Sequence, residues 1–362
     1  MNKDSKKAKL VLKDGTIIKG KLLGAKTSVS GEVVFNTGLV GYPQTLTDPS
    51  YRGQILVLTY PLIGNYGVPK KSIENNLLKY FESDKIHIKG LIISDYSFRY
   101  NHWNAANSLN DWLKENNIPA LYNVDTRELT KKLRDKGVMP GNIIVDKTIE
   151  FEDINQKNLV KEVSISAPIT YKKGKISVVL IDCGVKNSII RSFLKRDITV
   201  IRVPWDYEIE DLDYDGLFIS NGPGNPKVYT KTVKTIKMTL KNNKPIFGIC
   251  LGNQLLSLAA GADTYKLKYG HRSQNQPCIE VGTKKCFITS QNHGFAVNYD
   301  TLPKDWKLWF KNLNDDSCEG VKHKSKPFFS VQFHPEANPG PTDTEFLFDK
   351  FLEEIKRQKE KI

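Results

Sequence analysis

The feature of this sequence that most constrains its fold is a short apolar stretch that ends at a cysteine between small residues. Residues 245–249 have the composition of a buried strand, and Cys250 follows them directly. After it, Leu251, Leu255 and Leu258 recur with the spacing of one helix face. The chain must therefore turn sharply from a strand into a helix at Cys250, which predicts an α/β arrangement around this residue.

A cysteine at such a turn is suited to nucleophilic chemistry. Free backbone N–H groups and the dipole at a helix N-terminus favour the thiolate over the thiol, and a sharp turn exposes the sulfur above the sheet edge. On residue type alone, a buried structural cysteine is the more common alternative, because free cysteine packs as a small apolar side chain. A second motif, far downstream, favours the nucleophile.

That motif is His334-Pro335-Glu336, which follows an expected strand over residues 328–333. A residue before proline avoids helical geometry, so we expect His334 and Glu336 on an extended segment, where residues two apart point to the same side. Glu336 would then orient His334, and His334 would act as the base toward the thiol of Cys250. The three residues form a candidate set of nucleophile, base and orienting carboxylate.

The two motifs together resemble those of class I glutamine amidotransferases, which carry a G-x-C-x-G-x-Q turn and a distant H-P-E. The first motif is present here as Gly248, Cys250, Gly252 and Gln254. The resemblance implies that Cys250 attacks the side-chain amide of glutamine, that ammonia leaves, and that water then cleaves the γ-glutamyl thioester to glutamate.

Size and composition limit the class of protein. A chain of 362 residues has room for two domains, and its hydrophobic content of 39% and charged content of 26% are those of a globular protein. No apolar run approaches the roughly 20 residues of a membrane span, and the lysine-rich residues 1–9 lack the apolar core of a signal peptide. We therefore expect a cytoplasmic protein that does not contact a membrane.

The cysteines and the charge exclude further classes. Five cysteines are an odd number, without a C-x-x-C pair or a histidine at zinc-finger spacing, which favours reduced thiols over disulfides or structural zinc. The net charge of +14 raises the question of nucleic acid. However, the lysines are spread along the chain and no aromatic-basic motif stands out, so we interpret them as a solvated surface and expect no nucleic-acid partner.

The patterns predict two domains joined by a linker. Residues 1–150 mix a hairpin at Asp14-Gly15 with further strands and helices, and form a smaller α+β domain. Residues 151–174 are polar and form the linker. Over residues 175–362 strands and helices alternate, which predicts a mainly parallel sheet flanked by helices, with ligands at the carboxyl ends of its strands. A last helix is expected near the C-terminus, capped by Thr342 and Glu345.

Two further loops gain a role only from the resemblance. Residues 220–226, S-N-G-P-G-N-P, would by themselves be a plain turn after a strand, and residues 290–295, S-Q-N-H-G-F, a β-turn. The resemblance implies that the N–H groups of Gly224 and Leu251 stabilise the tetrahedral oxyanion. His293 is either adjacent to substrate or structural. The expected contacts to glutamine are Gly38, Gly222, Gly224, Leu251, Gln254, Asn292, Gly294 and Phe295.

Segments along the whole chain carry a more specific resemblance: residues 35–42, 46–51, 60–67, 124–130 and 134–137 in the N-terminal half, and residues 182–187 and 337–341 in the second domain. They resemble the small subunit of carbamoyl phosphate synthetase. The resemblance implies a large synthetase subunit as partner, which makes carbamoyl phosphate from ammonia, bicarbonate and ATP for pyrimidine and arginine synthesis. ATP and magnesium would belong to that subunit; we expect no cofactor and no metal in this chain, since residues 15–22 only approach a phosphate-loop pattern and lie in a hairpin.

Three positions depart from the family pattern. Asn253 replaces a histidine common in the turn, Gly38 stands where some members have a serine that touches substrate, and Asn225 replaces a frequent aspartate. Members without glutaminase activity have lost the nucleophile itself, whereas Cys250 is present here. An active glutaminase is therefore the leading hypothesis.

Other hypotheses remain open at this point. The chain could be a regulatory subunit whose site has decayed, or an amidotransferase that serves a synthetase for GMP, CTP or anthranilate. The intact cysteine, histidine and glutamate weigh against the first, and the N-terminal half weighs against the second. A nucleic-acid-binding role, suggested by charge alone, ranks last.

Overall fold

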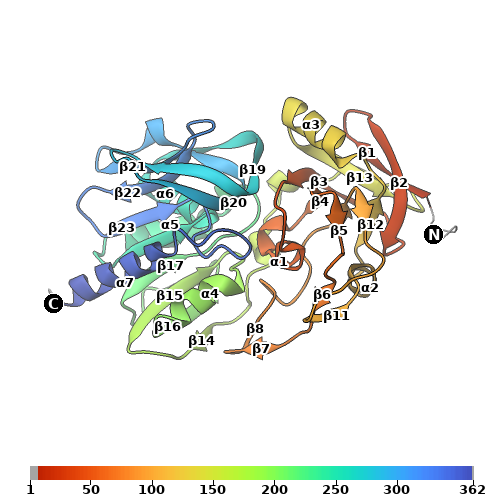
Figure 1. Ribbon diagram of the computed structural model, residues 1–362. Coiled ribbons are helices and arrows are strands. Elements are labelled where there is room, and N and C mark those ends of the chain that lie inside the picture. Colours follow the sequence, from red (N-terminus) through yellow and green to blue (C-terminus); the bar gives the residue numbers. More distant parts are fainter. Residues whose placement is uncertain (1–6, 361–362) are drawn as a thin grey trace. The chain divides into compact units, whose positions relative to one another are not determined.

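The computed structural model describes residues 7–360 and divides into two compact units, Met1–Lys157 and Asn158–Ile362 (Figure 1). The division falls within the stretch 151–174 that the sequence analysis interprets as a linker. The end of this stretch is not loose, because Ile169–Tyr171 forms strand β14 of the second unit. Among residues 7–360, no helix is long and apolar enough to cross a membrane.

The first unit is built on a closed seven-stranded barrel in the order β1-β13-β3-β4-β9-β12-β2. Its strands are β1 (Lys7–Leu12), β2 (Ile17–Gly24), β3 (Val29–Asn36), β4 (Gln54–Leu58), β9 (Gly90–Ile92), β12 (Pro119–Tyr122) and β13 (Met139–Ile144). Outside the barrel lie β5 (Leu62–Ile63), β6 (Val68–Pro69), β7 (Ile73–Glu74), β8 (Leu77–Leu78), β10 (Asp95–Tyr96), β11 (Ala105–Asn107), α1 (Tyr42–Thr47), α2 (Leu109–Glu115) and α3 (Thr126–Lys136).

Local signals in the sequence explain several of these elements. The predicted hairpin is confirmed: β1 pairs antiparallel with β2, and Gly15 takes the positive φ of +86° that the turn requires. Helices α2 and α3 begin at side-chain caps, where Ser108 and Asp125 accept hydrogen bonds from backbone N–H groups three residues on. The α+β composition is as expected, whereas closure into a barrel was not predicted.

The second unit contains one ten-stranded sheet in the order β14-β16-β15-β17-β18-β23-β22-β21-β19-β20. The predicted parallel part is confirmed in β16 (Ile198–Pro204), β15 (Ile176–Asp182), β17 (Gly216–Ile219), β18 (Ile246–Ile249) and β23 (Phe328–Val331). The antiparallel strands are β14 at one edge and β22 (Cys318–His323), β21 (Trp306–Asn312), β19 (Asp263–Glu280) and β20 (Cys286–Asn298) on the other side. The sheet is therefore only half parallel.

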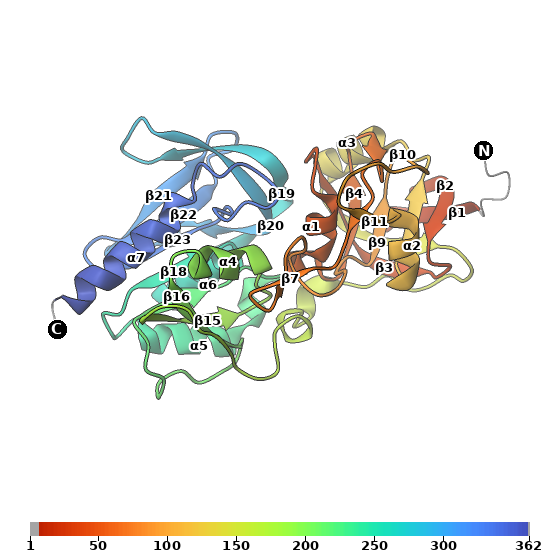
Figure 2. The ribbon, with the colours of Figure 1, turned by 60° about the horizontal axis from the view of Figure 1, so that its bottom comes forward.

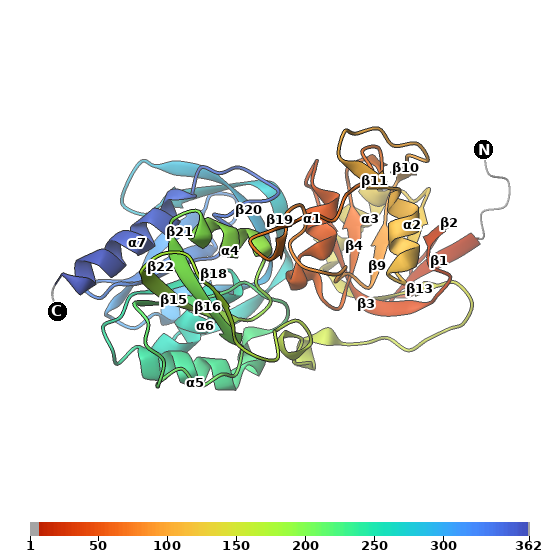
Figure 3. The same ribbon diagram turned by 90° about the horizontal axis from the view of Figure 1, so that it is seen from below.

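Helices cover both faces of the parallel strands (Figures 2 and 3). They are α4 (Asn187–Leu194), α5 (Thr230–Thr239), α6 (Leu251–Ala260) and α7 (Phe346–Lys359). Alternate residues of each strand serve the two faces. On one face Leu217 and Ile246 share a buried cluster with Leu255 of α6. On the other face Phe218 and Phe247 contact phenylalanine rings of α4 and α7, at centroid distances of 4.9 to 5.9 Å.

The predicted capping box of the last helix is wrong. Helix α7 begins at Phe346. Glu345 before it already has helical backbone angles (φ −58°, ψ −26°), and its side chain makes no capping hydrogen bond. Its N–H instead donates to the backbone carbonyl of Thr342 at 3.0 Å. The chain enters the helix through a backbone turn, which leaves the carboxylate of Glu345 to pair with Lys195 and Arg196 of the neighbouring α4 segment.

The aromatic face of the second unit generates a stability prediction. Phe247 is fully buried, and Phe247→Ala should lower the free energy of unfolding by about 3–5 kcal/mol, because the lost ring leaves a cavity among close-packed aromatic side chains. Phe346→Ala is the matched control: 43% of this residue is exposed, so its loss should cost no more than about 1 kcal/mol. Urea unfolding followed by fluorescence would compare the two, and equal losses would contradict the proposed packing.

Candidate active site

Cys250 lies at the sharp turn between β18 and α6, as the sequence predicts. Its backbone has φ 56° and ψ −105°, a conformation that residues with a side chain rarely adopt. The turn is held by the hydrogen bond from Cys250 N–H to the carbonyl of Val331 in β23, 2.8 Å long. It also needs small neighbours: a Cβ on Gly248 would lie 2.7 Å from the backbone of Gly252, and one on Gly252 would lie 2.1 Å from the carbonyl oxygen of Ile219.

His334 and Glu336 are brought together beside this turn. Nδ1 of His334 lies 2.6 Å from Oε1 of Glu336, and both residues are buried. Within residues 7–360, Nε2 of His334 has no partner at hydrogen-bond geometry. Burial alone would lower the pKa of His334, but the charge of Glu336 and the nearby Cys250 raise it to about 10. The pair with Glu336 thus favours the charged form of the His334 ring.

The local geometry of this motif differs from the prediction. Strand β23 ends at Val331, and the N–H of Ala337 donates to the carbonyl of His334 at 3.0 Å, so residues 334–337 form a turn rather than an extended segment. The turn is anchored by a hydrogen bond from His334 N–H to the carbonyl of Ser290 in β20. The side chains of His334 and Glu336 still meet, because the turn folds Glu336 back toward the ring.

Lys186 is a buried partner of this group that sequence reasoning missed. Its Nζ lies 2.9 Å from Oε1 of Glu336 and 2.6 Å from the carbonyl oxygen of Ala337. Burial would raise the pKa of Glu336, but the charges of Lys186 and His334 lower it to about 2. Lys186 follows β15, at the same edge of the sheet as Cys250. The signal in the sequence was a lone lysine shortly after a strand, in the segment D-C-G-V-K-N. This segment contributed to the family resemblance, but no role was assigned to its lysine.

The expected glutamine contacts on residues 290–295 lie on β20 and not in a β-turn. The thiol of Cys250 is 3.7 Å from the carbonyl oxygen of Asn292, within reach of a weak S–H donor. Gln254 of α6 donates to the carbonyl of Phe295 at 2.8 Å and to Oε1 of Gln332 at 3.1 Å. Asn292, Phe295 and Gln254 therefore surround the nucleophile. Gly294 lies between the first two, and the glutamine contacts of these residues stay predictions.

The loop after β17 is the expected oxyanion loop, and its glycines are required by packing. A Cβ on Gly222 would lie 2.1 Å from the carbonyl oxygen of Cys183. Gly224 has φ +86°, and a Cβ there would lie 2.3 Å from the hydroxyl of Tyr229. Leu251 is the first residue of α6, where backbone N–H groups have no carbonyl four residues earlier in the helix. The oxyanion roles of Gly224 and Leu251 stay predictions.

The three departures from the family pattern lie in different places. Asn253 is fully buried and joins α6 to β23: its Nδ2 donates to Gln332 at 3.1 Å, and its Oδ1 accepts from Ser330 at 2.9 Å. Asn225 accepts from the N–H of Lys227 and starts a short helical turn. Gly38 lies in the first unit, so its contact with glutamine stays a prediction.

One group of side chains within residues 7–360 has donor atoms close enough to share a metal ion. These are His271, His293 and Glu319, all buried, whose donor atoms lie within 4.8 Å of one another. Oε1 of Gln291 already lies 3.0 Å from Nδ1 of His271 and 3.1 Å from Nε2 of His293. Hydrogen bonds therefore account for this group, and the absence of a metal in the chain stays a prediction.

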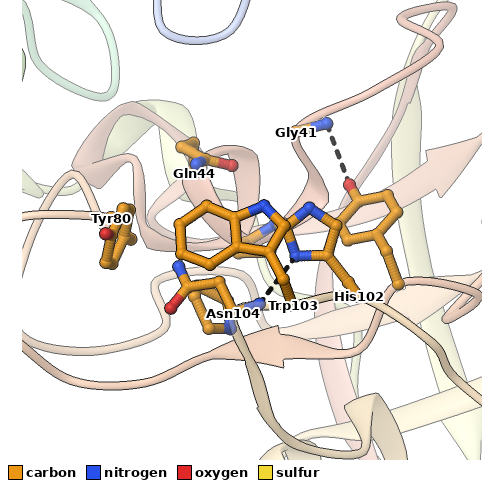
Figure 4. A pocket seen from close by; sticks show the side chains of 9 residues that line it. Gly41, Gln44, Tyr80, His102, Trp103 and Asn104 are labelled. Carbon is orange, nitrogen blue, oxygen red and sulfur yellow. Dashed lines mark hydrogen bonds between the residues drawn. The ribbon is translucent and has the colours of Figure 1, made fainter.

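The first unit has a hollow of about 330 Å³ with a different character (Figure 4). Its described walls are mainly aromatic and carry no carboxylate, amine or thiol, and Trp103 at the hollow is 83% exposed. Its rings offer stacking surfaces, and the imidazole of His102 lies among them. The lining residues are Gly41, Pro43, Gln44, Tyr66, Pro69, Tyr80, His102, Trp103 and Asn104.

Comparison with known families accounts for both units. Residues 10–143 match the family model described as "Carbamoyl-phosphate synthase small chain, CPSase domain", and residues 179–354 match "Glutamine amidotransferase class-I". The chain belongs to the family of carbamoyl phosphate synthetase small subunits. The suspected family and the class of fold are thereby confirmed.

Individual relatives are similar over nearly the whole chain. "Multifunctional protein CAD" of Squalus acanthias is 55% identical over 96% of this chain, which covers 16% of that protein. "Carbamoyl-phosphate synthase [ammonia], mitochondrial" of Homo sapiens is 49% identical over 97% of this chain, which covers 24% of it. This chain thus spans less than a quarter of these curated relatives. A solved glutamine amidotransferase from Thermotoga maritima is 19% identical, with a TM-score of 0.39 over 51% of this chain and 84% of that one.

The charge on His334 generates a prediction for stability against pH. Its pKa is raised from the ordinary 6.5 to about 10, so its contribution is fully present below pH 6.5 and is lost as pH rises through about 10. The free energy of unfolding should therefore fall more steeply between about pH 7 and pH 10 in the wild type than in His334→Asn. Urea unfolding at several pH values measures this slope. His323→Asn, a histidine of the same sheet, should keep the wild-type slope, and equal slopes in all three proteins would refute the charge assignment.

The buried pair of Lys186 and Glu336 generates a second prediction. Lys186→Met should lower the free energy of unfolding by about 3–5 kcal/mol, because it leaves a buried carboxylate with less compensation. The double variant Lys186→Met/Glu336→Gln should recover part of that loss. Lys195→Met, at the other end of helix α4, is the matched control: its side chain is 71% exposed and pairs with Glu345, so about 1 kcal/mol or less is expected. No recovery in the double variant would contradict a direct charge pair.

Proposed function

We propose that this chain is the glutaminase of a glutamine-dependent carbamoyl phosphate synthetase. The observation that carries the proposal is Cys250, held in a strained turn beside the buried pair of His334 and Glu336. A structural cysteine needs neither the strained backbone nor a charged imidazole next to it. The family of the chain supports the same chemistry.

The geometry suggests how the residues divide the reaction. The sulfur of Cys250 attacks the amide carbon of glutamine, and the thiol proton, held by His334, passes to the leaving nitrogen, which departs as ammonia. Water then attacks the thioester with His334 as base, which releases glutamate and restores the thiol. Glu336, itself held by Lys186, orients His334 throughout. The N–H groups of Gly224 and Leu251 would receive the oxyanion.

The ammonia would pass to a large synthetase subunit, which uses ATP, magnesium and bicarbonate. The relatives support this partner: they match nearly all of this chain and are several times longer, and one group of them is named as carbamoyl-phosphate synthase. We propose pyrimidine and arginine synthesis as the use of the product. The cytoplasmic location stays a prediction, because the named relatives include mitochondrial proteins.

A second candidate function is a regulatory subunit without glutaminase activity. The names of some relatives specify ammonia rather than glutamine, which favours this alternative for a chain that is 49% identical to them. Against it stand the intact nucleophile and its charged histidine. An amidotransferase for another synthetase is not favoured, because residues 10–143 match the carbamoyl-phosphate synthase family.

Replacing the nucleophile tests the proposal. Cys250→Ser should lower glutamine hydrolysis by on the order of 10³-fold or more, since no other group can form the thioester. Synthesis of carbamoyl phosphate from added ammonia by the complex with the large subunit should persist. Glutamate release is measured for the chain alone and in that complex with ATP and bicarbonate. Cys286→Ser, which replaces the exposed cysteine, is the control and should keep full activity.

Two results would count against the proposal in different ways. Near wild-type hydrolysis by Cys250→Ser would remove Cys250 as the nucleophile. No glutamate release by the wild type in either state, with the complex still formed, would favour the regulatory subunit.

A further inference from the structure

We propose that His271 is a positioning residue for glutamine binding, which fixes the segment of β20 that carries Asn292 and Phe295. This inference rests on the proposed glutaminase function and assigns a role to a residue outside the predicted site. His271 lies on β19 opposite His293 of β20, and the two rings meet edge to face at 4.9 Å between centroids.

His271 is held at both of its ring nitrogens by acceptors from other strands. Nε2 lies 2.9 Å from Oδ2 of Asp315, in the connection between β21 and β22. Nδ1 lies 3.0 Å from Oε1 of Gln291 and 3.3 Å from Oε1 of Glu319 in β22. Asn312 also approaches Nδ1, at 3.4 Å, but its amide hydrogens have closer acceptors in Glu319 and Gln276. The ring is thus fixed in one orientation.

The charges around His271 strengthen this arrangement. Burial alone would lower the pKa of His271, but hydrogen bonds to Asp315 and Glu319 and their charges raise it to about 9. Glu319 is fully buried, and burial raises its pKa. The hydrogen bond to His271 and the charge of that ring act in the opposite direction and lower the pKa of Glu319. Loss of the imidazole would leave this carboxyl group without its main cationic neighbour, which is costly inside a protein.

A chain of contacts connects His271 to the nucleophile. Oε1 of Gln291 lies between the two rings, 3.0 Å from Nδ1 of His271 and 3.1 Å from Nε2 of His293. Burial lowers the pKa of His293, and its neutral ring has a single N–H, which it donates either to this oxygen or to the carbonyl of Phe295. Nδ1 of His293 is 2.9 Å from the carbonyl oxygen of Phe295, which also accepts from Gln254 of α6 at 2.8 Å. Between these positions, the carbonyl of Asn292 faces the thiol of Cys250.

This geometry gives His271 an effect on binding rather than on the chemical step. Among the described residues the ring forms no hydrogen bond or ion pair with Cys250 or His334. Its neighbours on β20, Gln291 and His293, flank Asn292, which is expected to contact the substrate. Without the ring, the backbone pairing of β19 with β20 remains, but Gln291 and His293 lose their side-chain contact to β19 and the link through it to Glu319 of β22. The nucleophile and its base keep their own supports from β23 and Lys186.

The test separates KM from kcat in the holoenzyme. His271→Leu should raise the KM for glutamine by about 10-fold or more, while kcat changes by no more than about threefold. His271→Gln keeps an N–H donor toward the acceptors around the ring and should restore part of the affinity. The rate at which iodoacetamide alkylates Cys250 should stay within about twofold of the wild type, since the thiol and His334 are not altered. His323→Leu, on β22 of the same sheet, is the control and should leave KM unchanged.

Each outcome decides the inference. An unchanged KM in His271→Leu, or equal loss of kcat and kcat/KM without a change in KM, would overturn the positioning role. If His271→Leu does not fold, His271→Gln and Asp315→Asn replace it, and an unchanged KM in both has the same meaning. If the wild type does not hydrolyse glutamine, calorimetry compares glutamine binding by Cys250→Ser with and without His271→Leu. Equal binding overturns this inference, and no binding by either protein overturns it together with the proposed function.

Discussion

The backbone of Cys250 takes a conformation that costs on the order of 1–3 kcal/mol, and the parallel sheet around it supplies the means to hold it. Strand β18 lies between β17 and β23, so the residue before the turn cannot shift sideways without breaking ladders on both flanks. The carbonyl of Val331 fixes the N–H of Cys250. Gly252 lets the start of α6 press against Ile219 of β17, where a methyl group has no room. The strained turn is thereby held by β17, β23 and α6, which are themselves buried in the core of the second unit.

The same sheet brings the charged groups of the site to one edge. Lys186 follows β15, Cys250 follows β18, and His334 lies three residues beyond β23, so three parallel strands deliver a cation, a nucleophile and a base to their carboxyl ends. Burying such groups is costly unless each has a partner. Here the charges alternate from Lys186 to Glu336 to His334, which makes burial tolerable and leaves the cationic ring beside the thiol. The arrangement of charge is thus a consequence of strand order.

The features that could be predicted from the sequence are those that depend on residues close together in the chain. The hairpin at Asp14-Gly15 and the turn at Cys250 follow from signals within a dozen residues, and the cap of helix α3 at Asp125, found in the structure, is of the same local kind. The barrel closure, the antiparallel half of the second sheet and Lys186 depend on partners far away in the chain. Lys186 lies 150 residues from Glu336, and the residues around either one give no indication that the two side chains are paired.

Two predictions from local sequence patterns were wrong. Thr342 and Glu345 have the spacing of a capping box, yet a backbone turn occupies the positions that the side chains would need. The residue before Pro335 was expected to continue the strand. Instead, its N–H pairs with Ser290 of β20 and its carbonyl accepts from Ala337, so tertiary contacts favoured a turn. In the first case a local backbone hydrogen bond took the place of the side-chain cap, and in the second a hydrogen bond to a neighbouring strand outweighed the extended preference.

The site is therefore supported from both halves of the sheet, and contacts from the two halves meet at the carbonyl of Phe295. From the parallel side, α6 carries Cys250 and Gln254, and Gln254 donates to Phe295. From the antiparallel side, His293 of β20 contacts the same oxygen and is braced through Gln291 by His271. The parallel half positions the groups that make and break bonds, and the antiparallel half positions those expected to hold the substrate. The two halves meet at the carbonyl of Phe295, at the contact of Asn292 with the thiol, and at the hydrogen bond from the N–H of His334 to Ser290 of β20. A change in the antiparallel half that leaves the last of these intact can therefore alter binding while the nucleophile and its base keep their geometry.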